Sequence, residues 1–420
     1  MLKNKYIQHK ETIHNFTWRS LQIFGKQGIT FLIFVLCAKL LIPYDFGIYN
    51  YALAIIFFLI MFGDFGISTA TSKYVAEYNL TDKEKLKSVL FNSGIIILII
   101  TILITILTLI FGPLYLKDKY LYVLYLLPLI FLAPMTSLYD GIYRGLKKFK
   151  SLAIISLIIG LISVFFVYFL IKQYGLIGAL VSQNLFYLIL LLGLGLGYRD
   201  FNFKLNKQVI NEIGKYSFIY GLAIVGNYLF IRFGILILGH YNYIEEIATY
   251  ELINRIFMIL LLPFTLLGQV VAPNFAVLSA KKEYEKIKEK SIKYTIIFLL
   301  TGIILGLLFY FLIPYIFKLF FSNYFAKDYF GITFLLCTII YVTNVWAATF
   351  DAGILIPTGH AGLMAKTYLI LGILGVILSL ILVNYIGFLG VVLSFVISSF
   401  VMAIGLRAFY FSSFPKISQN

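Results

Sequence analysis

The sequence predicts an all-α polytopic membrane protein of about twelve transmembrane helices, arranged as two six-helix bundles. Of its 420 residues, 61% are hydrophobic and only 12% are charged, whereas soluble domains are about 45–50% apolar and about 25% charged. Its apolar runs, such as residues 94–112, are long and unbroken. Backbone groups in lipid must be satisfied internally, by helices or by a closed barrel. Barrel strands are about ten residues long and alternate apolar with polar residues, so these runs favour helices.

Twelve segments of the chain are long enough to cross a membrane as helices, which requires about 20 predominantly apolar residues each. They divide into two sets of six. The first set is expected near residues 18–40, 47–66, 89–111, 120–139, 151–172 and 175–198. The second set is expected near residues 214–239, 246–272, 292–320, 328–350, 364–385 and 387–410.

Lysine and arginine are concentrated in alternate loops between these segments, which predicts the orientation of the chain. The basic loops include Lys83, Lys147 and Lys286, whereas the loops on the other side, with Lys117 and Lys327, carry few charges. Because cytoplasmic loops carry the excess of Lys and Arg, both termini are expected on the cytoplasmic side of the cytoplasmic (inner) membrane. The same loop lysines explain the net charge of +16, so no nucleic acid partner is expected.

The two sets of six segments resemble each other. Residues 175–182 (GLIGALVS) match residues 387–394 (GFLGVVLS) at a shift of 212, and Asp140 matches Asp351 at a shift of 211. Six is an even number, so both halves enter the membrane in the same sense. The sequence therefore predicts parallel repeats, with an N-terminal bundle of residues 1–205 and a C-terminal bundle of residues 206–420. Such repeats, about an axis along the membrane normal, are typical of secondary transporters whose site lies between the halves.

Motifs for nucleotide binding, metal binding and catalysis are absent from the sequence. No G-x-x-x-x-G-K-[ST] occurs, so no phosphate-binding loop of an ATP-driven pump is expected. The four histidines include no i, i+4 metal pair, and Cys37 and Cys337 both lie within apolar runs. No long outer loop is available to hold a catalytic site. We therefore expect a protein without a cofactor, a metal site or enzymatic activity.

Polar residues in the first segment mark a candidate pathway. Asn15, Arg19, Gln22 and Lys26 follow one another at spacings of four, three and four, which places them on one face of a helix. Such a stripe does not face lipid, because a charged side chain at the membrane centre costs about 2.5–3.5 kcal/mol. We therefore predict that Arg19 and Lys26 line a wet cavity and bind the substrate. The alternative for Arg19 is that its long side chain extends to the cytoplasmic headgroups.

Two further cations lie in the second half. Arg232 is expected in the outer half of the seventh segment, one turn after Asn227, and Arg255 lies beside Asn254 in the eighth. We predict that these four residues also contact the substrate. The alternative for Arg255 is an i, i+4 ion pair with Glu251, which neutralises it. No carboxylate partner is expected for Arg232.

The deep cations outnumber the deep carboxylates, which favours an anionic substrate. Glu251 is the one deep acidic residue, whereas Asp64 and Asp140 lie near the cytoplasmic ends of their segments. A phosphate or pyrophosphate group presents several acceptor oxygens to such cations. One interpretation of Asp64, Asp140, Asp351 and Glu251 is that they carry a coupling ion, a proton or sodium. The simpler interpretation of the three aspartates is that they cap helices or hold loops.

Three segments carry a resemblance to a known family. GDFGISTATSKYVAEY (residues 63–78), DGIYRGLKKFK (residues 140–150) and PNFAVLSA (residues 273–280) resemble segments of bacterial O-antigen and exopolysaccharide flippases of the Wzx type. The resemblance covers essentially the whole chain. It implies the fold of the multidrug/oligosaccharidyl-lipid/polysaccharide (MOP) exporter superfamily, which includes MATE transporters, with two six-helix bundles around a V-shaped cavity.

The resemblance also implies a substrate. This would be an oligosaccharide on polyprenyl pyrophosphate, such as an O-antigen, capsule or exopolysaccharide repeat unit. Its sugar head would cross through the cavity while the lipid tail stays in the bilayer. Members commonly place basic residues on the first, seventh and eighth spans, and Lys26, Arg232 and Arg255 match by location. A polysaccharide polymerase is the implied partner protein. Two further spans of lipid II flippases are lacking, which argues against lipid II as the substrate.

Other functions remain open for a polytopic membrane protein. A cation-coupled multidrug antiporter of the same fold would need acidic residues in its cavity to bind organic cations, whereas the intramembrane charges are basic. A membrane polymerase would need longer outer loops, and a scaffold without transport is a third alternative. The sequence therefore predicts flipping of a lipid-linked oligosaccharide by alternating access, with multidrug antiport as the main alternative.

Overall fold

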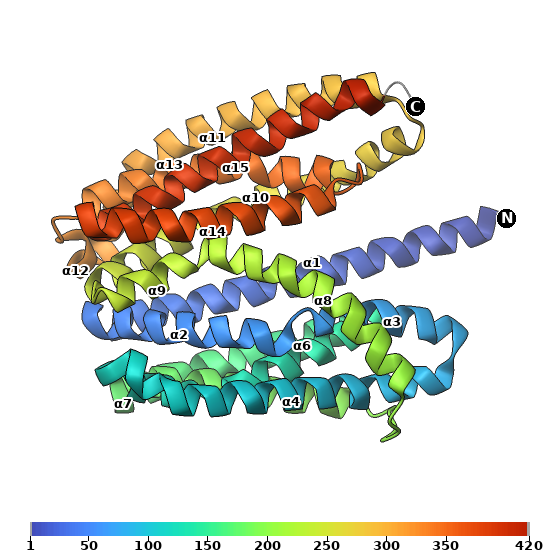
Figure 1. Ribbon diagram of the computed structural model, residues 1–420, viewed down its shortest axis with the longest axis horizontal. Coiled ribbons are helices and arrows are strands. Elements are labelled where there is room, and N and C mark those ends of the chain that lie inside the picture. Colours follow the sequence, from blue (N-terminus) through green and yellow to red (C-terminus); the bar gives the residue numbers. More distant parts are fainter. Residues whose placement is uncertain (1, 418–420) are drawn as a thin grey trace. The chain divides into compact units, whose positions relative to one another are not determined.

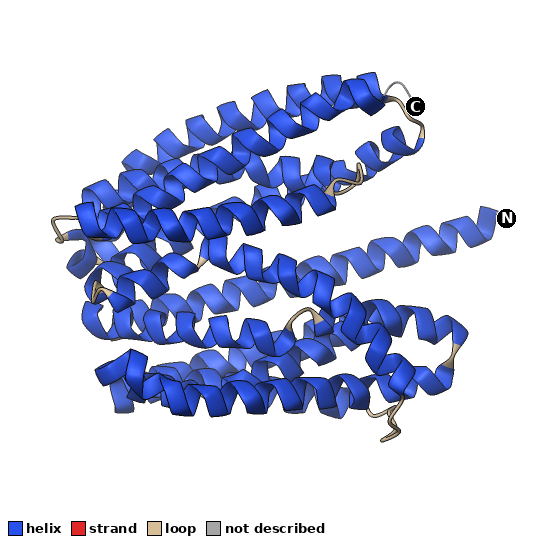
Figure 2. Ribbon diagram, viewed as in Figure 1, coloured by secondary structure: helices blue, strands red, loops and turns tan. Residues whose placement is uncertain are grey.

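The computed structural model describes the backbone of residues 2–417 and the side chains of residues 17–412 other than Ile219 and Ala361. Helices joined by short loops make up this part of the chain, and no β-strand occurs within it (Figure 2). The all-α class predicted from the sequence is therefore confirmed.

Two compact units make up the chain, divided between Ile224 and Val225 (Figure 1). Unit 1 contains α1 (Leu2–Leu40), α2 (Pro43–Asp64), α3 (Ile67–Thr81), α4 (Lys83–Leu116), η1 (Lys117–Lys119), α5 (Tyr120–Leu126), α6 (Leu129–Gly145) and α7 (Phe149–Gly197). Helix α8 (Lys207–Ile231) begins in unit 1 and ends in unit 2. Unit 2 continues with α9 (Phe233–His240), α10 (Ile244–Ala280), α11 (Tyr284–Phe320), α12 (Ser322–Phe325), α13 (Phe330–Phe350), η2 (Asp351–Leu355), α14 (Ala361–Ile386) and α15 (Phe388–Ile417).

The connection between α7 and α8 is tied to unit 1, which explains why the division falls inside α8. The Asn92 side chain on α4 donates to the Lys204 carbonyl over 3.0 Å and accepts from the Asn206 backbone N–H over 2.9 Å. Further along α8, a Cβ at Gly221 would lie 2.4 Å from the Phe65 ring. Residues 206–224, which the sequence groups with the C-terminal bundle, therefore pack with unit 1. The boundary of the repeats at residues 205 and 206 stays a prediction.

The twelve predicted spans fall largely on helices of the described chain, with breaks at residues 127–128 in the fourth and at Arg232 in the seventh, and the count of twelve stays a prediction. By length and composition, nine helical stretches of the described residues can cross a membrane, and the pair α8 and α9, bent by 51°, makes a tenth. The fifth and sixth predicted spans both lie within α7. Gly175 separates them, because its φ and ψ of 53° and −128° are not helical. The fourth predicted span falls on α5 and α6. The protein is therefore a multi-pass membrane protein.

The same helix-to-helix turn occurs once in each unit, at matched positions. Gly175 and Gly387 adopt φ, ψ of 53°, −128° and 62°, −141°, a conformation that glycine adopts without a Cβ clash. Three residues later, Gly178 and Gly390 leave no room for a Cβ, which would lie 1.9 Å and 2.4 Å from the carbonyl oxygen eight residues earlier. This local identity agrees with the parallel repeat that the sequence predicts.

Glycines in unit 1 allow the helices that carry the polar residues to pack closely on their neighbours. A Cβ at Gly141 or Gly145 of α6 would approach carbonyl oxygens of α3 to 2.4 Å and 2.7 Å. A Cβ at Gly25 of α1 would lie 2.0 Å from the Leu157 side chain of α7. Small residues let membrane helices approach closely in this way. Helix α6 therefore packs on α3, and α1 packs on α7.

Candidate functional site

A cavity of about 410 Å³ lies within unit 1, between α1, α2, α3, α6 and α7. Small-molecule sites typically enclose roughly 300–1,000 Å³. The polar side chains of the lining are Arg19, Gln22, Lys26, Gln27, Ser68, Thr136, Ser137, Asp140, Arg144, Ser156 and Tyr187. Apolar residues such as Phe57, Ile60 and Leu152 complete the wall. The cavity is therefore large enough, and polar enough, to hold a polar group of a substrate.

The polar stripe predicted on the first segment lines this cavity. Arg19, Gln22 and Lys26 share one face of α1 because of their spacing, and all three belong to the lining. Gly25, which packs on α7, lies on a neighbouring face and holds α1 in place. The side chain of Asn15, the fourth residue of the predicted stripe, lies outside the described residues.

Asp140 links α1 to α6 inside the cavity. The Nε of Arg144, one turn further along α6, lies 2.6 Å from Oδ2 of Asp140. The Gln22 side-chain amide donates to Oδ1 of Asp140 over 3.4 Å, and Arg19 donates to the Gln22 amide oxygen. Arg19 is therefore held in this network, which favours its role in the cavity over extension to the headgroups.

The lining carries an excess of positive charge. Arg19, Lys26 and Arg144 stand against the single carboxylate of Asp140, a formal excess of two positive charges. The Lys26 side chain is exposed, and it forms no ion pair with the described residues. Since cations placed within a membrane are costly, such residues usually mark a substrate or ion pathway. The arrangement suits an anion with several acceptor oxygens.

Asp64 and Asp140 have different roles in the structure. The simpler interpretation of the sequence was that both cap helices or hold loops. The Asp64 carboxylate accepts from the Ser68 backbone N–H over 2.9 Å and from the Ser68 hydroxyl over 2.8 Å. It therefore caps α3 after the break at Phe65 and Gly66, which adopt positive φ of 35° and 82°. The capping interpretation is wrong for Asp140, because it lies inside α6 and lines the cavity.

Arg232 and Glu251 form a buried ion pair in unit 2. The Arg232 NH1 lies 2.8 Å from Glu251 Oε2, and the side chains are 28% and 3% exposed. Arg232 occupies the bend between α8 and α9, with φ and ψ of −121° and −21°. The prediction that Arg232 lacks a carboxylate partner is therefore wrong. Residue spacing along one segment does not reveal a partner on another helix, here α10.

The other predicted site residues of the second half lie on α8 and α10. Asn227 is exposed, Asn254 is 8% exposed, and Arg255 is half-buried. The structure thus brings Arg19 and Lys26 into one cavity of unit 1, whereas the four predicted residues of the second half belong to unit 2. The role of these four in substrate binding stays a prediction.

The sequence analysis did not predict that Asp140 and Arg144 line a cavity, because its simpler interpretation of Asp140 was a helix cap or a loop contact and it assigned no role to Arg144. Two signals in DGIYRG (residues 140–145) could have found them. Glycines four residues apart mark a helix face packed closely on another membrane helix. Asp140 and Arg144 also have the i, i+4 spacing of an ion pair on one helix. Both signals place the pair on a packed helix and not in a loop.

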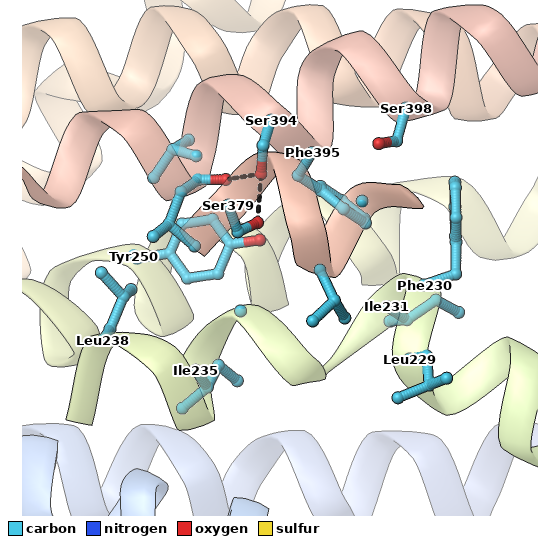
Figure 3. Close-up of a pocket in the computed structure, with 15 residues that line it drawn as sticks. Leu229, Phe230, Ile231, Ile235, Leu238, Tyr250, Ser379, Ser394, Phe395 and Ser398 are labelled. Atoms are coloured by element: carbon cyan, nitrogen blue, oxygen red, sulfur yellow. Dashed lines mark hydrogen bonds between the residues drawn. The ribbon is translucent and has the colours of Figure 1, made fainter. Parts of the chain in front are cut away.

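A second and much smaller pocket lies in unit 2 (Figure 3). Its volume is about 30 Å³, enough for a water molecule. Figure 3 shows the Ser379 and Ser394 hydroxyls joined by a hydrogen bond, and the Ser394 hydroxyl also donates to the Val391 carbonyl over 2.7 Å. Tyr250 and Ser398 also line this pocket. It is too small for a saccharide, whereas the polar cavity of unit 1 is large enough, and we take that cavity as the candidate site.

Comparison with known proteins places the chain in a family and identifies proteins that share its fold. Residues 12–279 match the family described as polysaccharide biosynthesis protein. No curated protein matches the chain in sequence. An inward-facing multidrug resistance MATE family transporter of the MOP superfamily has a TM-score of 0.78 at 16% identity, over 96% of this chain and 99% of that chain.

Two further solved structures share the fold at similarly low identity. The lipid II flippase MurJ, in an inward closed conformation, has a TM-score of 0.72 at 17% identity, over 97% of this chain and 90% of that chain. A MOP superfamily transporter from Pyrococcus furiosus has a TM-score of 0.63 at 15% identity, over 97% of this chain and 96% of that chain. Since the family match covers more than half of the chain, the protein belongs to the polysaccharide biosynthesis protein family, and its fold is that of the MOP-superfamily transporters and flippases.

Proposed function

We propose that the protein flips a polyprenyl-pyrophosphate-linked oligosaccharide across the cytoplasmic membrane by alternating access. The observation that carries this proposal is the cavity of unit 1, where Arg19, Lys26 and Arg144 outnumber Asp140. Membership of a polysaccharide biosynthesis family supports a saccharide substrate. The similarity to a lipid II flippase supports a substrate that is linked to a lipid.

The chemistry of the lining matches a pyrophosphate joined to a sugar. A guanidinium presents a planar fork of donors to phosphate oxygens, and an ammonium adds a compact point charge. Arg19, Arg144 and Lys26 supply both kinds of group. The amides of Gln22 and Gln27 both donate and accept hydrogen bonds, as sugar hydroxyls require. The apolar lipid tail stays in the bilayer, where its burial is favourable.

Cation-coupled multidrug antiport is the second candidate, because a multidrug resistance transporter is among the similar structures. An organic cation leaving water is stabilised by carboxylates or by aromatic faces. In the cavity of unit 1 the one carboxylate, Asp140, already contacts Arg144 and Gln22. The excess of cations therefore disfavours an organic cation in this cavity.

The loop charges indicate the orientation of the protein in the membrane, and the proposed substrate indicates the pathway that it serves. Both termini lie on the cytoplasmic side, because the basic loops stay there. The repeat unit of an O-antigen, capsule or exopolysaccharide enters from the cytoplasm, and a polysaccharide polymerase receives it on the outer side. A proton or sodium gradient supplies the driving force. Arg232, Arg255, Asn227 and Asn254 of unit 2 add further contacts to the substrate.

Reconstitution in proteoliposomes tests the proposal and separates it from its alternative. Transbilayer movement is measured for a fluorescent polyprenyl-pyrophosphate-linked oligosaccharide, for the same saccharide on an uncharged polyprenol, and for a cationic drug. We expect protein-dependent movement of the pyrophosphate-linked compound alone. Movement of the cationic drug without movement of the pyrophosphate-linked lipid would establish antiport instead. Equal movement of the charged and uncharged lipids would contradict recognition of the pyrophosphate.

A further inference from the structure

Asp351 is a buried carboxyl group at the junction of α13 and η2 in unit 2. Its side chain is 8% exposed, and its Oδ1 has no hydrogen-bond partner among the described residues. The η2 segment is a single π-helical turn, in which the Ile356 N–H donates to the Asp351 carbonyl over 3.2 Å. Such turns are rare and frequently occur at functional sites. Since a buried charge without compensation is strongly unfavourable, this carboxyl group must be neutralised.

The matching carboxylate in unit 1 is neutralised by its neighbours. Asp140, at the corresponding position 211 residues earlier, has the Arg144 guanidinium at 2.6 Å and the Gln22 amide at 3.4 Å. In unit 2, the position that corresponds to Arg144 is held by the buried apolar side chain of Leu355. Unit 2 therefore has the carboxyl group without the guanidinium that compensates its counterpart.

Arg407 of α15 acts electrostatically on Asp351, but its guanidinium contacts other groups, and its Nε has no hydrogen-bond partner among the described residues. The guanidinium carbon lies 4.1 Å from the ring centroid of Trp346 and 4.5 Å from that of Phe350. The guanidinium also donates to the Ala403 carbonyl over 2.6 Å and to the Trp346 carbonyl. Cation–π contacts and hydrogen bonds stabilise a desolvated guanidinium. Among the described residues, no ion pair joins Arg407 to Asp351.

We propose that Asp351 is a proton-binding site of unit 2, protonated in this conformation and releasing its proton to water when the site opens. A protonated carboxyl is neutral, so it needs no counter-ion in its buried position. Opening of the π-helical turn to water lets the carboxyl ionise, since hydration then stabilises the charge. Protonation of Asp351 does not depend on the transported compound, but the role of the site in coupling rests on the proposed function, in which a proton or sodium gradient drives transport.

A sodium ion fits this environment less well than a proton. The titratable groups that face Asp351 are Arg407 of α15 and Tyr368 of α14. Helix α10 approaches η2 with Gly268, which lies against Ala352 and has no side chain to offer. A metal cation beside the Arg407 guanidinium would be repelled, and hard cations require several oxygen ligands. A proton requires only the carboxyl oxygen itself.

Infrared difference spectroscopy of the purified protein in lipid nanodiscs tests the protonation state without any substrate. We expect Asp351→Asn to remove the C=O stretching band of a protonated carboxyl at neutral pH and to leave the carboxylate bands unchanged. This band shifts in D₂O, and raising the pH removes it reversibly from the wild type. Asp140→Asn is the matched spectroscopic control, and it should remove carboxylate bands because Asp140 is paired with a guanidinium.

Three results would overturn the proposal. Loss of carboxylate bands in Asp351→Asn would show that Asp351 is ionised. Loss of the protonated band when sodium is added at constant pH would show that the site takes sodium. The Tm of Asp351→Asn is expected to match that of the wild type, because a neutral amide replaces a neutral carboxyl. A variant that unfolds or fails to fold would show that Arg407 depends on a negative charge at Asp351.

Discussion

The Nε of Arg144 lies 2.6 Å from Oδ2 of Asp140 one turn earlier on α6, and Gln22 of α1 donates to the same carboxylate. One side chain therefore positions groups from two helices of the cavity. Asp140→Asn preserves the shape of the side chain and removes its charge. We expect the flipping rate to fall about tenfold, the equivalent of about 1.4 kcal/mol. Substrate affinity should not fall, because the cavity loses a negative charge.

Flipping rate and affinity are measured on the same reconstituted variants. Glu77→Gln is the control, because it makes the same charge change at an exposed position of α3, and its flipping rate should equal that of the wild type. A wild-type rate for Asp140→Asn would show that Arg144 does not depend on Asp140 for its position.

Gly141 is expected to be essential for the packing of α6 on α3. A Cβ at this position would lie 2.4 Å from the Ser68 carbonyl oxygen, and overpacking of this kind costs about 1–3 kcal/mol. Gly141→Ala should therefore lower the Tm in detergent. Gly94→Ala is the matched control on α4, where the nearest atom to the new Cβ lies at 3.9 Å. Its Tm should be unchanged or higher, and an equal loss in both variants would refute the packing argument.

The ion pair between Arg232 and Glu251 predicts unequal effects of removing its two members. Arg232→Ala leaves the Glu251 carboxylate, 3% exposed, without its counter-charge, which costs about 3–5 kcal/mol in comparable buried pairs. Glu251→Gln leaves Arg232, which is 28% exposed and so retains partial hydration. Arg232→Ala should therefore lower the Tm more than Glu251→Gln. The double variant Arg232→Gln/Glu251→Gln should recover part of the loss.

The same variants separate a structural role of Arg232 from substrate binding. If Arg232 also binds the substrate, the double variant regains stability without regaining flipping. Recovery of both properties together would show that Arg232 serves only to pair with Glu251.

Membrane orientation is tested by labelling single cysteines in intact cells. Cysteines that replace Lys83 and Lys286 should be protected from membrane-impermeant thiol reagents, because both positions belong to basic loops on the cytoplasmic side. A cysteine that replaces Lys117, in the short turn after α4, should react. Cys37 and Cys337 are buried and should give little background. Labelling at position 286 from outside would reverse the predicted orientation of unit 2.

The fold was largely predictable because its determinants are local. Long apolar runs specify helices in lipid whatever their neighbours are. The recurrent G-x-x-G segment also specifies the turns at Gly175 and Gly387, where the observed φ and ψ nearly coincide. The compact division inside α8 was not predictable in this way. It depends on contacts of Asn92 with Lys204 and Asn206, which are more than a hundred residues away in sequence.

The candidate site was predictable only in part, for the same physical reason. Helical spacing placed Arg19, Gln22 and Lys26 on one face, and all three line the cavity. Spacing along one helix does not show which side chains of another helix meet that face, so Asp140 of α6 was missed. The partner of Arg232 was missed likewise, because Glu251 lies on a different helix, α10.

The central claim is that the cationic cavity recognises the anionic head of the substrate. The most direct test measures the Kd of the purified protein, in nanodiscs, for a polyprenyl-pyrophosphate-linked oligosaccharide. Hydrogen bonds to charged groups contribute about 1.5–3 kcal/mol each, so Lys26→Ala and Arg144→Ala should each raise Kd about tenfold or more. Lys83→Ala removes the same charge at an exposed position outside the cavity and should leave Kd unchanged. Wild-type Kd values for both Lys26→Ala and Arg144→Ala would contradict the claim that this cavity binds the pyrophosphate.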